Sequence, residues 1–416
     1  MFILYNIFIN IFCIFSKIYL KIRIKNKKEH PERYLEKLSI TSFPVNKNRL
    51  IWFHAASVGE LLSIFPLIDK FLKENLFEKI LVTSITLSSS RIFEKKYKNN
   101  GKIIHQFLPI DKKKFVKNFL NHWKPNALIL IESEIWPNLI FEVKKNNIPL
   151  ILLNARITSK TFFKWKFLKN FALSIFKKID LCIASNKETE IFLEKLGAKK
   201  IKNLGNLKFS GNLIFQKENK NPIIESKKKI WCAVSTHSSE EVVCAKAHLK
   251  LKLENKNTLG IIIPRHISRI NSIKKSLSNL NLEIQTVDED ENIKDSTDIL
   301  LVNTYGEVTK YLSLSNLAFL GGSLVKHGGQ NPIEAAKLGC KICHGPHIEN
   351  FHEIYEYLHN SNLSKVINND DELYKFLKIN FHSDFHEKEN IIRKINEHGE
   401  NILSNIIKEI KNHLAI

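Results

Sequence analysis

Glu60 is the first residue of this chain whose position suggests chemistry. It ends the stretch IWFHAASVGE, residues 51–60, in which an apolar run gives way to small residues, a glycine and a carboxylate. A carboxylate just beyond the end of a strand can serve as a general base. The spacing Ser57-x-x-Glu60 also matches a capping box, which stabilises the first turn of a helix. A helix N-terminus would keep this carboxylate ionised and make it a weaker base. The residues alone leave both roles open.

A glycine-rich loop, GGSLVKHGGQNPIE at residues 321–334, is the second feature suited to chemistry. Its four glycines allow the backbone to come close to a ligand. Asn331 is expected to cap a following helix, with Pro332 at the first helical position and Glu334 at the third. Free N–H groups at such a helix start attract an anion, and phosphate suits this chemistry. An ordinary capped helix is the alternative.

Cationic side chains follow other strand-like runs. Arg265, His266 and Arg269 lie in PRHISR, and Lys208 lies in GNLKF. Ligands of open α/β sheets bind beyond the carboxyl ends of the strands, so these cations are placed to hold a carboxylate or a phosphate. Surface cations without a ligand are the alternative.

These loops belong to two successive arrays in which short apolar runs alternate with amphipathic stretches. Nearly continuous apolar runs predict strands that are covered on both faces of a parallel sheet. The expected strands are residues 50–56, 79–85, 127–133, 149–155 and 181–186, then 229–235, 259–264, 282–287, 298–304, 317–323 and 341–346. Residues 60–74 and 186–196 are among the expected helices. The pattern predicts an α/β protein with two doubly wound domains.

The domain boundary is expected in the polar, Lys- and Asn-rich stretch at residues 213–228, where the periodicity is weakest. This linker separates a first domain at 36–212 from a second domain at 229–385. Residues 386–416 are expected to form one or two amphipathic helices.

The first 22 residues are largely apolar and lead into the basic run KIRIKNKK, residues 21–28. A secretory signal has its charge before the apolar part and a small-residue cleavage site after it, and this segment has neither. We therefore expect an uncleaved membrane anchor that either spans or inserts into the interface, with the remaining chain on the cytoplasmic face. The basic run would bind anionic lipid headgroups. A buried core helix is the alternative.

The chain is strongly basic, with 64 Lys and Arg against 42 Asp and Glu and a net charge of +22. This charge favours an anionic partner such as a membrane surface or an acidic ligand, unless compositional drift towards Lys accounts for it. The basic residues are spread along the chain without a nucleic-acid-binding motif, so no nucleic acid is expected as a partner. The six cysteines are scattered, mostly in apolar runs, which indicates reduced, buried thiols.

Eight motifs of the chain, in their order along the sequence, resemble those of the Kdo transferase family, the 3-deoxy-D-manno-oct-2-ulosonic acid transferases of lipopolysaccharide assembly. They are IWFHAASVGE, ESEIWPNLI, NARI, GNLKF, STHSSEE, PRHISR, GGSLVKHGGQNPIEAA and HGPHIENF, within about residues 32–352. The resemblance implies a GT-B fold, in which an acceptor-binding and a CMP-Kdo-binding Rossmann-like domain face a cleft. It implies an inverting, metal-independent transfer of Kdo from CMP-Kdo to a lipid A precursor, lipid IVA, at the inner membrane, with no cofactor.

The resemblance also assigns site residues. It implies that Glu60 is the catalytic base. It implies donor-binding roles for Lys208, Arg265, His266, Gly322, Ser323, Asn331 and Glu334, and further cleft positions for Ser57, Glu134, Arg156 and His237. No metal-binding residue is expected. Two positions depart from the family pattern, because Gln330 stands where the family usually has His and Asn303 where it usually has Asp.

Three other motifs are interpreted as structural rather than chemical. The D-x-D spelling at 288–290 lies in a run of acidic residues typical of a solvated loop. The C-x-x-C-H spelling at 340–344 matches a haem attachment motif, but it continues an expected strand on the cytoplasmic side. The histidines at 344, 347 and 352 lack a second ligand group at regular spacing, so we do not expect zinc.

Two other functions remain alternatives. One is a sugar-nucleotide epimerase or another GT-B transferase, which would also need a phosphate loop but has no reason to carry a membrane anchor. The other is a non-catalytic, membrane-associated binder of lipid A or nucleotide. The intact Glu60, Lys208, Arg265 and Glu334 argue against this second alternative.

Overall fold

A computed structural model of the chain divides into two compact units. The first unit comprises Met1–Asn212 with Gly399–Ile416, and the second comprises Leu213–His398. The structure describes residues 1–45, 47–211, 213, 228–287, 293–381 and 385–416. Most of the linker expected at 213–228 therefore lies outside the described residues, as does the D-x-D spelling at 288–290.

The first unit is built on a seven-stranded parallel sheet with the order β3-β2-β1-β4-β5-β6-β7. The strands are β1 (Leu50–His54), β2 (Lys79–Ser84), β3 (Ile103–Phe107), β4 (Ala127–Ile131), β5 (Leu150–Ala155), β6 (Leu181–Ala184) and β7 (Ile201–Asn203). The chain extends the sheet in one direction from β1 to β3 and in the other from β4 to β7. The point where β1 and β4 lie side by side is therefore the topological switch point, where such sheets bind ligands.

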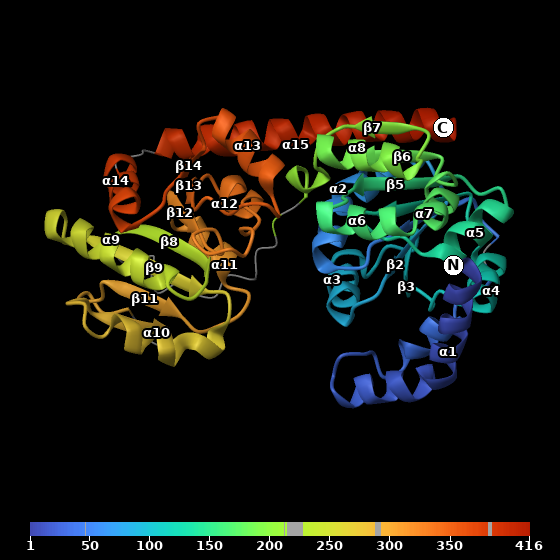
Figure 1. Ribbon diagram of the computed structural model, residues 1–416, viewed down its shortest axis with the longest axis horizontal. Coiled ribbons are helices and arrows are strands. Elements are labelled where there is room, and N and C mark those ends of the chain that lie inside the picture. Colours follow the sequence, from blue (N-terminus) through green and yellow to red (C-terminus); the bar gives the residue numbers. More distant parts are fainter. Residues whose placement is uncertain (46, 212, 214–227, 288–292, 382–384) are drawn as a thin grey trace. The chain divides into compact units, whose positions relative to one another are not determined.

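Helices cover both faces of this sheet (Figure 1). They are α2 (Val58–Lys73), α3 (Leu87–Tyr97), α4 (Lys113–Trp123), α5 (Pro137–Lys145), α6 (Ser159–Phe167), α7 (Lys169–Phe176) and α8 (Lys187–Leu196), with short 3₁₀ turns η1 (Arg33–Leu38) and η2 (Leu207–Phe209). The N-terminal helix α1 (Phe2–Lys25) packs through Phe2 against α5 and α7. Neighbouring residues of β1 illustrate the two layers. The Trp52 ring packs on Phe119 of α4, whereas the Phe53 ring packs on Phe71 of α2. Successive side chains of a strand point to opposite faces, so α4 and α2 lie on opposite sides.

The second unit repeats this plan with the strand order β10-β11-β9-β8-β12-β13-β14. Its strands, all parallel, are β8 (Lys229–Thr236), β9 (Thr258–Pro264), β10 (Ile284–Val287), β11 (Ile299–Val302), β12 (Leu317–Leu320), β13 (Lys341–His344) and β14 (Ser364–Val366). The remaining elements are α9 (Glu240–Glu254), η3 (Ile267–Arg269), α10 (Ile270–Leu277), α11 (Val308–Ser313), α12 (Ile333–Lys337), α13 (His352–Asn360) and α14 (Asp370–Asn380). The switch point here lies between β8 and β12.

The predicted α/β class with two doubly wound sheets is confirmed, and every expected strand is present. Three further strands, β3, β7 and β14, were not predicted. β3 buries the polar side chains of His105 and Gln106, and the other two are three-residue edge strands with exposed positions. None of the three therefore reads as an apolar run. The C-terminal segment forms one helix, α15 (Phe385–Leu414), which begins in the second unit and ends in the first.

Candidate functional site

Glu60 lies just beyond β1, in the first turn of α2, at the switch point of the first unit. Ser57 caps the helix, because its hydroxyl accepts a hydrogen bond from the Glu60 N–H at 3.3 Å. The Glu60 carboxylate points back to the cap, accepting from the Ala56 N–H at 2.8 Å and from the Ser57 hydroxyl at 2.7 Å. The Ser57 half of the capping box is therefore formed, whereas the Glu60 carboxylate accepts from the N–H of Ala56 rather than from that of Ser57. These contacts hold the carboxylate in a defined position.

The protonation of Glu60 corrects the expectation of a weakened base. Burial raises the pKa of this carboxyl group, and the nearby carboxylates of Glu132 and Glu134 raise it further. The hydrogen bonds from Ser57 and Ala56 act in the opposite direction, but the pKa remains above its ordinary value. Desolvation therefore outweighs the helix terminus, and Glu60 binds a proton more readily than an exposed glutamate.

Glu132 and Glu134 follow β4, the strand next to β1, so they lie on the other side of the switch point. Glu134 accepts a hydrogen bond from the Trp136 indole N–H at 2.8 Å, and its Oε2 lies 3.1 Å from Nε2 of the fully buried His54. Glu132 lies 2.6 Å from Nζ of Lys208. The site thus gathers three carboxylates with one lysine and one imidazole.

Lys208 and Arg156 reach this region from the far half of the sheet. Lys208 belongs to η2, whose position is fixed by Asn154 at the end of β5, because the Asn154 amide oxygen accepts from the Leu207 N–H at 2.8 Å. Arg156 directly follows β5, and its carbonyl oxygen accepts from the Ser133 hydroxyl at 2.6 Å. The predicted residues Ser57, Glu60, Glu134, Arg156 and Lys208 therefore all lie at the carboxyl end of the first sheet.

At the switch point of the second unit, a buried carboxylate fills the place expected for an anion. Glu240, at the start of α9, is fully buried. Its Oε2 accepts from the N–H groups of Gly322 at 2.7 Å and His237 at 2.8 Å. Its Oε1 accepts from Ser323 at 3.0 Å and Leu324 at 2.9 Å. The glycine-rich loop was expected to offer free N–H groups to a phosphate, but three of its N–H groups bind Glu240.

The helix after the glycine-rich loop also differs from its prediction. α12 begins at Ile333, one residue later than expected, so Pro332 takes the cap position and Asn331 precedes it. The Asn331 side chain still accepts from the Ile333 N–H at 3.2 Å. Glu334 is the second helical residue, and its carboxylate accepts a hydrogen bond from the Thr309 hydroxyl. With only five residues, α12 offers a weaker dipole than a full helix.

Three histidines and two arginines follow β8, β9 and β12. The His237 ring stacks on His327 at a centroid distance of 4.1 Å and meets the edge of His266 at 6.3 Å. Burial lowers the pKa of His237, and the neighbouring His327 and His266 lower it further. Arg265 and His266 are exposed beyond β9. Arg269, by contrast, is held by Glu241 in a bidentate ion pair at 2.9 and 3.1 Å.

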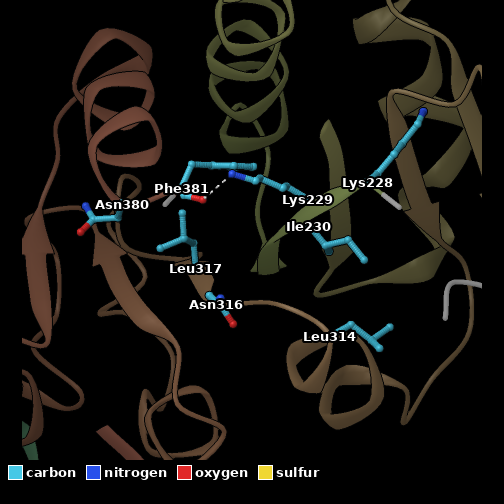
Figure 2. Close-up of a pocket in the computed structure, with 8 residues that line it drawn as sticks. All are labelled: Lys228, Lys229, Ile230, Leu314, Asn316, Leu317, Asn380 and Phe381. Carbon is cyan, nitrogen blue, oxygen red and sulfur yellow. Dashed lines mark hydrogen bonds between the residues drawn. The ribbon is translucent and has the colours of Figure 1, made fainter. Parts of the chain in front are cut away.

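A pocket of about 280 Å³ in the second unit lies away from these residues. Figure 2 shows its lining, which includes Lys229 at the start of β8 and Leu317 at the start of β12. It therefore opens at the amino ends of the strands, opposite to the end where parallel sheets bind ligands. We do not assign it a functional role.

The cysteines are buried thiols, as expected, except that Cys13 is only partly covered. Burial raises the pKa of the Cys340 thiol to about 12. Within the described residues, no group of three or more His, Cys, Asp or Glu side chains is arranged to hold a metal ion.

Sequence reasoning missed three residues of the site, His54, Glu132 and Glu240. His54 and Glu132 were quoted within strand-end motifs without a role, although each stands at the carboxyl end of a central strand. Glu240 follows the histidine of STHSSEE by three residues, a spacing that allows a side chain to bond back to the loop. No local signal indicates that its partner loop lies more than 80 residues away.

A family model for 3-deoxy-D-manno-octulosonic-acid transferase (kdotransferase) matches residues 29–211. A 3-deoxy-D-manno-octulosonic acid transferase of Rickettsia bellii is 33% identical, over 86% of this chain and 85% of that protein. The enzyme of the same name from Haemophilus influenzae is 29% identical, over 74% and 73%.

Among solved structures, a putative UDP-N-acetylglucosamine 2-epimerase from Listeria monocytogenes matches with a TM-score of 0.62. It shares 14% identity and covers 88% of this chain and 96% of its own, so the likeness concerns the GT-B-like fold alone. The sequence relatives identify one family of enzymes, whereas the fold alone does not. The chain belongs to the 3-deoxy-D-manno-octulosonic acid (Kdo) transferase family of glycosyltransferases.

Proposed function

We propose that this protein transfers Kdo from CMP-Kdo to lipid IVA, with inversion at the anomeric carbon of the sugar. The observation that carries the proposal is the position of Glu60. Its carboxylate is fixed by two hydrogen bonds at the switch point of the first sheet, and its pKa is raised. These are the properties of a general base that must take a proton from a sugar hydroxyl.

In the proposed reaction, the acceptor hydroxyl donates its proton to Glu60 as its oxygen attacks the anomeric carbon of Kdo. A new carbon–oxygen bond forms while the bond to the CMP phosphate breaks, and CMP leaves as an anion. Attack from the face opposite to the leaving group inverts the anomeric carbon. The Glu60 carboxylate can keep its 2.7 Å contact with Ser57 in this step, because an ionised carboxylate offers about four lone-pair sites on its two oxygens.

Lys208 is proposed to contact the donor, and its present ion pair suggests how. The lysine lies 2.6 Å from Glu132, and both side chains are largely covered. The Lys208 ammonium group has three N–H donors, so an incoming carboxylate or phosphate could bind it beside Glu132. The Kdo carboxylate is such a group.

The second unit is proposed to bind the nucleotide of the donor. Gly322 and Ser323 are proposed to line this site while Glu240 fixes their backbone. Arg265, His266 and His237 supply cationic or hydrogen-bonding groups at the same end of the sheet, with Asn331 and Glu334 beside the loop. A site of this kind stabilises the departing phosphate electrostatically without a metal.

A lipid acceptor requires the enzyme to work at a membrane, and α1 is proposed to provide the attachment. It is apolar enough and long enough to enter a bilayer, and it is the one helix of the described residues that meets both conditions. We propose the cytoplasmic face of the inner membrane as the location, because the basic run at 21–28 follows the apolar segment.

The test is a reconstituted assay with the purified full-length protein, CMP-Kdo and tetraacylated lipid IVA in detergent micelles, without added metal and with a chelator present. We expect a Kdo-bearing lipid by mass spectrometry and one CMP released for each Kdo transferred. The anomeric configuration of the product can be read by NMR. Absence of the lipid product, or CMP release that does not depend on lipid IVA, would overturn the proposal.

A further inference from the structure

The N-terminal helix α1 has two faces that differ in exposure. On the face towards the first unit, Ser16 and Leu20 are buried and Phe2, Tyr5, Asn6, Ile9, Phe12, Cys13, Arg23 and Ile24 are partly buried. The opposite face is exposed, and it carries Ile3, Leu4, Ile7, Phe8, Ile11, Ile14, Phe15, Ile18, Tyr19 and Ile22. We call these ten exposed residues the apolar stripe.

A helix on a water-soluble surface turns its polar face to solvent, whereas α1 exposes ten large apolar side chains. Here several polar residues of the helix, such as Asn6, Ser16 and Arg23, lie on the covered face. The exposed fraction of the stripe side chains ranges from 46% at Tyr19 to 75% at Ile3. An exposed stripe of this size indicates a surface that meets an apolar partner.

Both ends of the helix are fastened to the first unit. At the start, the Phe2 ring stacks on Phe141 of α5 at 4.4 Å, and the Tyr5 hydroxyl donates to the buried Asp111 carboxylate at 2.7 Å. Figure 1 shows this end of α1 beside α5. At the other end, Arg23 pairs with Glu29 at 3.2 Å.

The second attachment continues into the core of the unit. Glu29 is itself buried and pairs with Lys37 of η1 at 2.7 Å. Lys37 in turn donates to the carbonyl oxygen of Ile85 at 2.9 Å, and its own carbonyl accepts from the Ile110 N–H. The end of α1 is therefore tied to the loops that follow β2 and β3.

These contacts conflict with a helix that crosses the bilayer. A helix of 24 residues is about 36 Å long, so in a spanning orientation its two ends would lie on opposite sides of the membrane. The charged residues near the start of α1 would then have to enter or cross the lipid with it. They are Asp111, which accepts a hydrogen bond from Tyr5, and Lys178, whose Nζ lies 4.7 Å from the centre of the Phe141 ring on which Phe2 stacks. A helix held along the domain at both ends must instead lie parallel to the membrane surface.

We propose that α1 is an in-plane membrane helix, whose apolar stripe enters one leaflet while its covered face stays on the first unit. The proposal rests on the membrane association proposed above and adds its geometry. The partner is a leaflet with anionic headgroups, because the exposed Lys17, Lys21, Lys25 and Lys27 lie along the same helix and its end. Such lysines place their charge at the headgroups while their stems remain in the apolar layer.

The depth of three stripe residues tests this geometry. Leu4, Ile11 and Ile18 lie seven residues apart on the same side of α1, and each is replaced singly by cysteine in a Cys13→Ser background. Cys13 is the partly covered thiol, and the other five are buried. Each cysteine is labelled with an environment-sensitive dye, and the full chain is mixed with phosphatidylethanolamine–phosphatidylglycerol vesicles that carry quenchers at known depths.

We expect all three dyes to be quenched at the same shallow depth. A spanning helix would separate Leu4 and Ile18 by about 21 Å along the bilayer normal, and that result would overturn the in-plane proposal. Absence of quenching at all three sites would overturn the membrane association on which it rests. A dye that is already shielded from water before vesicles are added would point to a second copy of the chain on the stripe, and would also overturn the proposal.

Vesicle partitioning of serine variants provides a second measurement. A Leu4→Ser, Ile11→Ser double variant should bind these vesicles at least about tenfold more weakly, because two large apolar side chains no longer enter the lipid. The matched control is Leu253→Ser with Ile379→Ser, two side chains of the second unit that are 81% and 71% exposed. The control should bind like the unchanged protein, and equal losses in the two variants would contradict a specific role for the stripe.

Discussion

At the scale of single residues, the geometry of Glu60 makes a capping role compatible with the catalytic role proposed for it. The capping box orients the carboxylate, and burial together with two neighbouring carboxylates raises its pKa. Each effect alone is common in proteins. Their combination at the switch point of a parallel sheet is what distinguishes Glu60 from an ordinary cap.

Replacement of Glu60 by glutamine should remove the base and keep the fold. The glutamine side chain of the Glu60→Gln variant retains an oxygen that can accept from the Ala56 N–H, but it cannot take up the proton of the acceptor hydroxyl. We expect kcat for Kdo transfer to fall by about 10²- to 10⁴-fold. The melting temperature should change little, and CMP binding, measured by calorimetry, should be unaffected.

Glu372→Gln is the matched control for this variant. Glu372 closes a similar capping arrangement at α14, where its N–H donates to Asn369 at 2.9 Å and its carboxylate accepts from the Asn368 N–H at 2.9 Å. It lies away from the carboxyl ends of the strands that form the switch points. Equal losses of activity in the two variants would assign Glu60 a structural role only.

The pH dependence of kcat/KM should report the raised pKa of Glu60. Activity requires the ionised form, so it should rise with pH through a pKa above that of an ordinary glutamate. Glu132→Gln removes one of the two neighbouring negative charges that raise this pKa, so the pKa of Glu60 should fall. The acid limb of the profile, the pH range in which kcat/KM rises, should then shift to lower pH. Because burial is the largest cause, the limb should still lie above the ordinary value.

The exposed Glu78 supplies the control for this measurement, since Glu78→Gln removes a carboxylate of the same unit without removing a neighbour of Glu60. An acid limb that moves equally in both variants would indicate a general charge effect. If Glu132→Gln leaves the acidic side of the kcat/KM profile unchanged, a group other than Glu60 controls the activity at low pH.

Glu240→Gln should destabilise the second unit and weaken its binding of the donor nucleotide. The carboxylate accepts four backbone N–H groups, and a glutamine side chain would direct its own N–H₂ donors at some of them. We expect a loss of about 1–3 kcal/mol of unfolding free energy and weaker CMP binding. Urea unfolding and calorimetry measure the two effects, and unchanged CMP affinity would exclude the loop from the donor site.

At the scale of elements, the sequence predicts central strands well and edges poorly. The apolar runs of β1, β4, β8 and β9 are buried on both faces, so composition alone reveals them. β7 and β14 have exposed positions at the sheet edges, where packing gives no comparable signal.

The candidate site was predicted only in part. Glu60 was found from its position beyond a central strand, Glu134 was assigned by the family resemblance, and Glu132, which directly follows β4, was missed. Glu240 was missed as well, because its role depends on a loop that reaches it only after the chain has folded. The contacts of α1 with the first unit could not be predicted either, because hydropathy shows that a helix is apolar but not which of its faces packs on the domain.

Packing of α15 on the first unit provides a test at the same scale. A Cβ atom at Gly399 would lie 2.4 Å from the carbonyl oxygen of Phe209, in the turn that carries Lys208. Gly399→Ala should therefore displace η2 and weaken substrate binding, although alanine favours a helix by about 1 kcal/mol. We expect a raised KM for CMP-Kdo and a lower melting temperature.

The exposed Asn405 on the same helix is the matched position for this variant. Asn405→Ala should gain helix stability and keep the KM of the unchanged protein. A Gly399→Ala variant with unchanged KM would show that α15 does not position Lys208.

At the scale of the whole molecule, each of the two units places its polar groups at the switch point of its own sheet. In the first unit these groups are mainly carboxylates with one lysine, which suits proton abstraction. In the second they are histidines and two arginines near a loop whose backbone is fixed by Glu240, which suits an anionic nucleotide. The proposed division of labour between base and donor site thus rests on which side chains the same fold presents at the same topological position.

The net charge of +22 should govern how fast the molecule reaches a membrane, and the apolar stripe should govern how long it stays. Raising salt from 0.01 M to 1 M shortens the screening length from about 30 Å to about 3 Å, so the association rate with anionic vesicles should fall steeply. Dissociation should barely respond, because salt does not screen buried apolar contacts. Stopped-flow mixing with vesicles measures both rates, and vesicles of neutral lipid serve as the control with little salt dependence of association. If salt instead accelerated dissociation, charge rather than the stripe would hold the protein on the lipid.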